Sequence, residues 1–168
     1  MDRTSAYDPP FTPQPEAGHV LLCGKPSSMS VAMFLREFYH ADHGEQRTRV
    51  VILNPEEPGK DLVDVIEDPL YSGEVKYVQY VKGSVMSVND LFKVLAFEVR
   101  NPDQTRVPTP LDRDCLQATC IFIFSNQFSD NLCSSDLDCI LASKAIGSLV
   151  DMERPGHTIP TYFQILKV

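Results

Sequence analysis

This sequence of 168 residues lacks the signals of several protein classes. No apolar run approaches the ~20 residues that a membrane-spanning helix requires, and the opening residues 1–17 are too polar and too rich in proline for a secretory signal. The five cysteines form no C-x-x-C pair, so zinc spacing is missing and their odd number fits a reducing compartment. What remains is an ordinary globular composition, 43% hydrophobic and 23% charged.

Positive charge is also scarce, and the formal net charge is −8. A chain so acidic is poorly suited to binding nucleic acid or an anionic membrane surface. Catalytic signals are few as well: no G-x-S-x-G elbow surrounds Ser84 or Ser87, and no histidine stands near Cys133 in the sequence. We therefore expect that the chain is not an enzyme.

Strand and helix patterns alternate along the chain. Strands are predicted at His19–Gly24, Arg49–Leu53, Val75–Val81, Ala118–Phe124 and Thr158–Leu166. Helices are predicted at Met29–His40, at Asp61–Glu67, from a cap at Ser87 to about Glu98, and at Ser135–Asp151. Apolar stripes predict that the first helix buries Val31, Phe34, Leu35 and Phe38, and that the third buries Val88, Leu91, Phe92 and Leu95.

Right-handed crossovers turn this alternation into a doubly wound, Rossmann-like parallel sheet, so the predicted fold class is α/β. We expect a single domain at 18–168, a proline-rich tether at 1–17 and a surface insertion at 100–114. Because such a domain normally adds a helix after its last strand, we also expect the chain to be a fragment, or another chain to cover that face.

The turn after the first strand lacks the chemistry that binds a dinucleotide. A nucleotide-binding turn reads G-x-G-x-x-G, whereas only Gly24 is kept here, and Pro26 and Met29 stand in place of the later glycines. The acidic residue that would hold the ribose after the second strand is replaced by Asn54 and Pro55. The sequence therefore predicts the scaffold of a nucleotide-binding domain without its cofactor site.

The loop after the fourth strand gathers oxygen-bearing side chains at the edge of the sheet where ligands bind. They are Asn126, Asp130, Asn131, Asp136 and Asp138. Such groups suit Ca²⁺, which takes six to eight oxygen ligands, although the spacing is not that of an EF-hand. Helix capping explains two of them equally well, with Ser135 as N-cap, Asp138 at the third position and Asp136 in the first turn. Both interpretations stay open.

The histidine pair in His40-Ala41-Asp42-His43 is also a conceivable ligand pair. The pair follows the first predicted helix and precedes Gly44, so a solvated helix end is the simpler interpretation.

Three segments together resemble the RCK (regulator of K⁺ conductance) domain of Slo-type calcium-activated potassium channels, most closely the first of the two in each subunit. They are Val20–Asp42, Gly83–Leu91 and Ala118–Ala145. The resemblance implies a cytoplasmic regulatory domain in a gating ring under the pore of a homotetrameric channel, with other RCK domains as partners. Residues 1–17 would then form the linker to the pore-lining helix, and ion binding would be coupled to pore opening.

The resemblance also implies a calcium site. An ungapped alignment places Asp136 on the family's aspartate, while Asn131 falls where the family often has an acidic residue. Asp136 and Asn131 are therefore the predicted metal residues of an incomplete site. Ca²⁺ is expected only in the full-length channel and no cofactor in this fragment. Two alternatives remain: a nucleotide-sensing RCK domain or NAD-dependent enzyme, and an assembly module whose calcium site has been lost.

Overall fold

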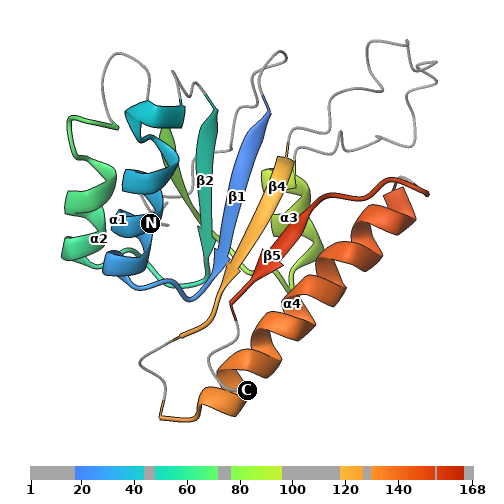
Figure 1. Ribbon diagram of the computed structural model, residues 1–168. Helices are drawn as coiled ribbons and strands as arrows, with labels where there is room; N and C mark the ends of the chain where they lie inside the picture. Colours follow the sequence, from blue (N-terminus) through green and yellow to red (C-terminus); the bar gives the residue numbers. More distant parts are fainter. Residues whose placement is uncertain are drawn as a thin grey trace, which may run out of the picture.

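Five parallel strands form one sheet, in a computed structural model that describes residues 18–43, 48–71, 77–95, 118–126, 130–153 and 155–164. The predicted tether at 1–17 and insertion at 100–114 lie outside these ranges. The strands are β1 (His19–Gly24), β2 (Arg49–Asn54), β3 (Val78–Lys82), β4 (Ala118–Phe124) and β5 (Thr161–Phe163). Their order, β3-β2-β1-β4-β5, is that of a Rossmann-like sheet, as predicted (Figure 1).

Helices cover both faces of the sheet (Figure 1). They are α1 (Ser28–Phe38), α2 (Lys60–Ile66), α3 (Val88–Leu95) and α4 (Leu132–Glu153), with a short 3₁₀ helix η1 (Ala41–His43) after α1. The helices α1 and α2 pack on one face and α3 and α4 on the other. This follows because the right-handed crossovers run in one direction along the sheet from β1 to β3 and in the opposite direction from β3 to β5. Among the described residues, no helix is long and apolar enough to span a bilayer.

The core consists of two apolar layers, one on each face of the sheet. Leu21, Cys23 and Leu53 point toward α3 and α4, whereas Val20 and Leu22 point toward α1 and α2. The central strands are therefore apolar on both faces, which explains the unbroken hydrophobic runs that predicted them.

Several predicted details differ from the structure, and three of them bear on the packing. Helix α4 begins at Leu132, three residues before the predicted start at Ser135, so Ser135 is not its N-cap. Val88 is exposed, because α3 turns Leu91 and Val94 toward the sheet and leaves its first residue facing outward. Within the described residues, strand β5 pairs over Thr161–Phe163 and not from the predicted start at Thr158, consistent with Pro160, which cannot donate a ladder hydrogen bond. The predicted end at Leu166 lies outside those residues.

Candidate functional site

The turn from β1 to α1 is closed against the neighbouring strand. Gly24 has a φ of 95°, and a methyl group on its Cα would overlap the carbonyl oxygen of Phe124 at the end of β4. The next backbone N–H, that of Lys25, donates to this same oxygen at 3.1 Å. Glycine is thus required here by the close approach of two strands, and the Lys25 N–H is already used within the protein.

The beginning of α1 is also capped from within. Pro26 has no N–H, and the Ser27 hydroxyl oxygen accepts the N–H of Ser30 at 3.1 Å. A helix N-terminus binds a phosphate through N–H groups that point at the ligand. The protein itself occupies or lacks several of those donors in this turn, which agrees with the loss of the later glycines.

Asn54, at the position expected for the ribose-binding acid, shapes a turn. Its side-chain oxygen accepts the N–H of Glu56 at 3.0 Å, and its backbone oxygen accepts the N–H of Gly83 at 2.9 Å. The residue is buried and holds the β2–α2 turn beside the end of β3. An amide in this position stabilises the scaffold and does not present a carboxylate to a sugar.

A cavity of about 250 Å³ lies at the carboxyl edge of the sheet, between the β3–α3 connection and α4. Its polar side chains are few and come from different elements. It is lined by Gly24, Lys25, Leu53, Pro55, Ser84, Val85, Met86, Ile123, Phe124, Asn126, Ser135, Asp138, Cys139, Leu141 and Ala142.

The predicted metal residue Asp136 lies on the side of α4 that faces the protein interior. Only 8% of the residue is exposed, and its Oδ1 accepts a hydrogen bond from the hydroxyl of Ser125 at 3.2 Å. Ser125 directly follows β4 and is also 2.8 Å from the hydroxyl oxygen of Ser135, which in turn accepts the N–H of Asn126 at 2.7 Å. The aspartate is therefore part of a buried polar cluster between β4 and α4.

The second predicted metal residue, Asn131, stands just before α4 and acts as its cap. Its Oδ1 accepts the N–H of Ser134 at 3.2 Å. The prediction that a side chain of this loop caps the helix is thus confirmed, but the capping residue is Asn131 and not Ser135. Asp136 consequently lies beyond the first turn, where its interaction with the helix dipole is weak.

These positions do not by themselves match a calcium shell. Ca²⁺ requires six to eight oxygens directed at one point, whereas Asp136 and Asn131 each already accept a hydrogen bond within the protein. Asp130 and Asp138 are exposed. In the ranges that the structure describes, no three His, Cys, Asp or Glu side chains gather closely enough to hold a metal. The assignment of Asp136 and Asn131 as ligands stays a prediction.

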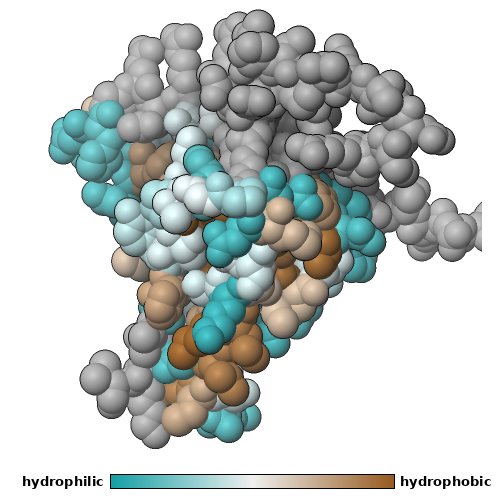
Figure 2. All heavy atoms as spheres, turned by 90° about the vertical axis from the view of Figure 1, so that its right-hand side faces the viewer, coloured by the Kyte–Doolittle hydropathy of each residue, from teal (hydrophilic) through white to brown (hydrophobic). Residues whose placement is uncertain are grey.

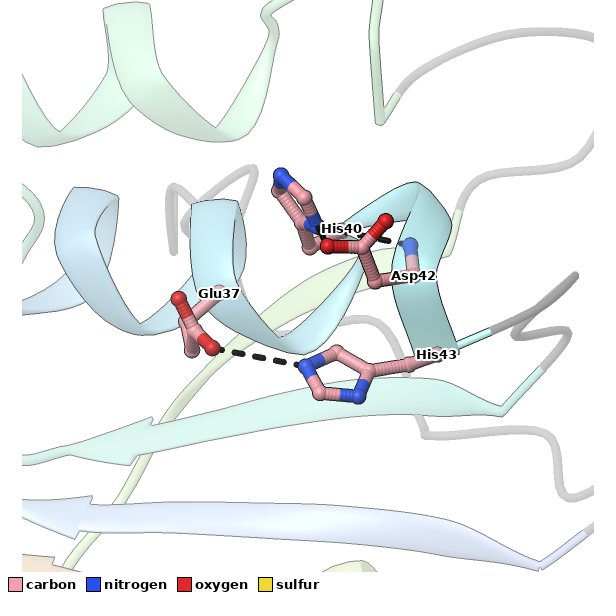
Figure 3. A network of polar contacts seen from close by, with 4 residues as sticks. All are labelled: Glu37, His40, Asp42 and His43. Atoms are coloured by element: carbon pink, nitrogen blue, oxygen red, sulfur yellow. Dashed lines mark hydrogen bonds and ion pairs between the residues drawn. The ribbon is translucent and has the colours of Figure 1, made fainter.

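The histidine pair after α1 contacts two different carboxyl groups (Figure 3). His40 Nδ1 lies 3.3 Å from Asp42 Oδ2, and His43 Nε2 lies 3.3 Å from Glu37 Oε1. All four side chains lie on the exposed end of α1 and η1. This geometry agrees with a solvated helix end.

Sequence reasoning missed the central role of Ser125 in the cluster at the β4–α4 junction. A serine directly after a buried strand carries no signal of its own in the sequence. Only the fold shows that Ser125 reaches two consecutive residues of α4.

Known proteins resemble this chain in sequence over part of its length and in fold. Residues 16–98 match the family model of the calcium-activated potassium channel slowpoke-like RCK domain. Among solved structures, the human SLO3 gating ring is similar at a TM-score of 0.56 and 18% identity. The match covers 89% of this chain but only 20% of that chain, so this chain spans about a fifth of that relative. Over residues 16–98, just under half of its length, the chain is thus similar to the Slo-like RCK domain family.

Proposed function

We propose that this chain is a cytoplasmic regulatory domain in the gating ring of a calcium-activated potassium channel. The match to the slowpoke-like RCK family model over residues 16–98 and the Rossmann-like fold support this function. The closed phosphate-binding turn supports it over the nucleotide-sensing alternative and over an NAD-dependent enzyme, because several of the N–H donors that would bind a pyrophosphate are occupied or missing.

The outward face of α4 is the structural observation that carries the assembly part of the proposal. Leu137, Ile140 and Leu141 are 53%, 40% and 43% exposed, on the side of the helix opposite the buried Cys139 and Ile146. Figure 2, which looks onto the side formed by α4 and β5, shows hydrophobic residues gathered on its lower half. A helix that is apolar on two opposite sides is suited to packing between the core and a partner.

In this proposal the partners are other RCK domains of a homotetrameric channel, and residues 1–17 connect the domain to the pore-lining helix. The mechanism is a population shift in which ions bind the open form of the ring more tightly. A swing of about 5 kcal/mol between closed and open forms requires roughly 10⁴-fold tighter binding to the open form, summed over all sites. The domain transmits this free energy to the pore and makes or breaks no covalent bond.

Current recordings from inside-out patches test the function. Cells that express the full-length gene product should show potassium currents that increase when calcium is added to the cytoplasmic face. NADH or ATP on the same face should leave the currents unchanged. Currents that respond to a nucleotide and ignore calcium would support the nucleotide-sensing alternative instead.

A further inference from the structure

We propose that Asp136 is a positioning residue which, with Ser125, fastens the beginning of α4 to the end of β4, and that it is not a calcium ligand in this chain. The proposal concerns the regulation of the gating-ring domain and in that respect rests on the proposed function. The hydrogen bonds from which it is argued are independent of that function.

The fastening consists of three hydrogen bonds in a small volume. Ser125 Oγ reaches Ser135 Oγ at 2.8 Å and Asp136 Oδ1 at 3.2 Å, and Asn126 N–H reaches Ser135 Oγ at 2.7 Å. Ser125 and Asn126, which directly follow β4, are thereby bonded to the consecutive residues Ser135 and Asp136 of α4. Together these bonds hold the two residues that follow β4 against the first turns of α4.

Burial makes these bonds energetically important. Ser125, Ser135 and Asp136 are all more than nine-tenths buried. Removing one partner leaves the other polar group buried without that bond, which costs more than the net value of the bond itself. Apolar packing continues directly from this cluster, because Cys139 follows one turn later on the same helix and lies in the core. The start of α4 is therefore positioned by both hydrogen bonds and packing.

The same contacts argue against ion binding at Asp136. A calcium ligand must direct its oxygen at an ion shared with several other oxygens. The oxygen atom of Asp136 that accepts from Ser125 points into the junction, while the side-chain oxygen of Asn131 is used by the cap of α4. Asp138, two residues after Asp136, is exposed and lines the cavity instead. The side-chain oxygens of Asn131, Asp136 and Asp138 thus serve three separate parts of the structure.

Thermal unfolding of the 168-residue chain in a calcium chelator tests the fastening. Ser125→Ala and Asp136→Ala should each lower the melting temperature by roughly 3–8 °C, and the double variant should lower it by less than the sum. Asp136→Asn keeps an acceptor oxygen and should recover most of the loss. Asp138→Ala is the matched control: it removes the same charge from an exposed position of the same helix and should shift the melting temperature by no more than about 1–2 °C.

Two further readouts separate a positioning role from a ligand role. In Ser125→Ala, amide hydrogen exchange should accelerate in the peptide that contains Asn126 and Ser135, because the junction opens more often. Calcium alone, added in place of the chelator, should leave the melting temperature of the wild-type chain unchanged.

The proposal is overturned if Asp136→Ala melts like the wild type in chelator. It is also overturned if calcium raises the melting temperature of the wild type and of Asp138→Ala but not of Asp136→Ala, because specific ion binding stabilises the folded state. The failure of the proposed function is seen separately. A full-length channel that ignores calcium contradicts that function and leaves the fastening at the β4–α4 junction intact.

Discussion

At the scale of single residues, Gly24 shows how a position kept from a nucleotide-binding turn can have another cause. In a dinucleotide-binding turn, the first glycine allows a tight turn at the end of the strand. Here the φ of 95° and the neighbouring carbonyl of Phe124 already demand glycine. The residue is therefore retained by the packing of β1 against β4, even though the rest of the phosphate-binding pattern is absent.

Gly24→Ala should destabilise the chain by at least about 3 kcal/mol, since alanine is strained at this φ and its methyl group overlaps Phe124. Gly147→Ala provides the contrast. This glycine lies in the exposed middle of α4 with no atom near its added methyl group, so the substitution should stabilise the chain by roughly 0.5–1 kcal/mol. Urea unfolding measures both changes, and equal effects of the two substitutions would contradict the argument.

At the scale of elements, the prediction from the sequence was most accurate for strands that are buried on both faces of the sheet. Strand β1 begins and ends as predicted and β2 is longer by one residue, because strands buried on both faces are continuous apolar runs. Strand β4 also keeps its predicted bounds, although one of its faces is only partly buried. The start of α4 was less predictable. Asn131 and Ser135 are both good caps, and only the burial of Ser135 against the end of β4 decides between them.

The candidate site could be predicted from the sequence less completely than the fold could. The loss of nucleotide chemistry could be predicted, because a missing glycine or carboxylate is visible residue by residue. The surroundings of Asp136 could not, because they depend on Ser125, which is brought to α4 by the sheet. Periodicity places an aspartate on a helix but does not determine which strand end meets it.

The outward apolar face of α4 leads to a prediction about assembly. Leu137→Glu should weaken self-association of the chain by about tenfold or more, because a charge would replace an apolar side chain in the proposed contact. Folding stability should change little, since Leu137 is exposed. Sedimentation equilibrium over a concentration series measures the association. Ser148→Glu, on the same side of α4 but about three turns beyond Leu137, is the control. Association of Leu137→Glu as tight as that of the wild type would exclude this face.

At the scale of the whole molecule, acid stability depends on a histidine buried where β1 begins. The Nε2–H of His19 donates to the backbone oxygen of Val94 in α3, which ties the central strand to a helix. Burial lowers the pKa of His19 from 6.5 to about 4, although the bond to Val94 acts in the opposite direction. The folded protein thus keeps this imidazole neutral at pH values at which the unfolded chain protonates it.

The sign of the effect follows from proton linkage. Below pH 6.5 the unfolded chain binds a proton that the folded chain refuses, so the contribution of His19 is complete above that pH and falls as the pH drops toward 4. The slope approaches about 1.4 kcal/mol per pH unit. Asp90 acts in a lower window. Burial raises its pKa, but hydrogen bonds from Ser84 N–H and Lys93 outweigh this and lower it below 3.8, so its contribution is lost only under stronger acid.

Replacing the titrating group should therefore flatten the pH dependence. His19→Gln retains a side-chain N–H for the Val94 carbonyl but has no proton to gain, so its free energy of unfolding should change much less than that of the wild type between about pH 6.5 and 4. Urea unfolding across this window measures the difference between the two slopes. Parallel curves would mean that other groups control acid stability. A flatter dependence on pH for His19→Gln would show that protonation of His19 is coupled to unfolding of the whole sheet. The coupling is expected because β1 is the central strand and pairs with both β2 and β4.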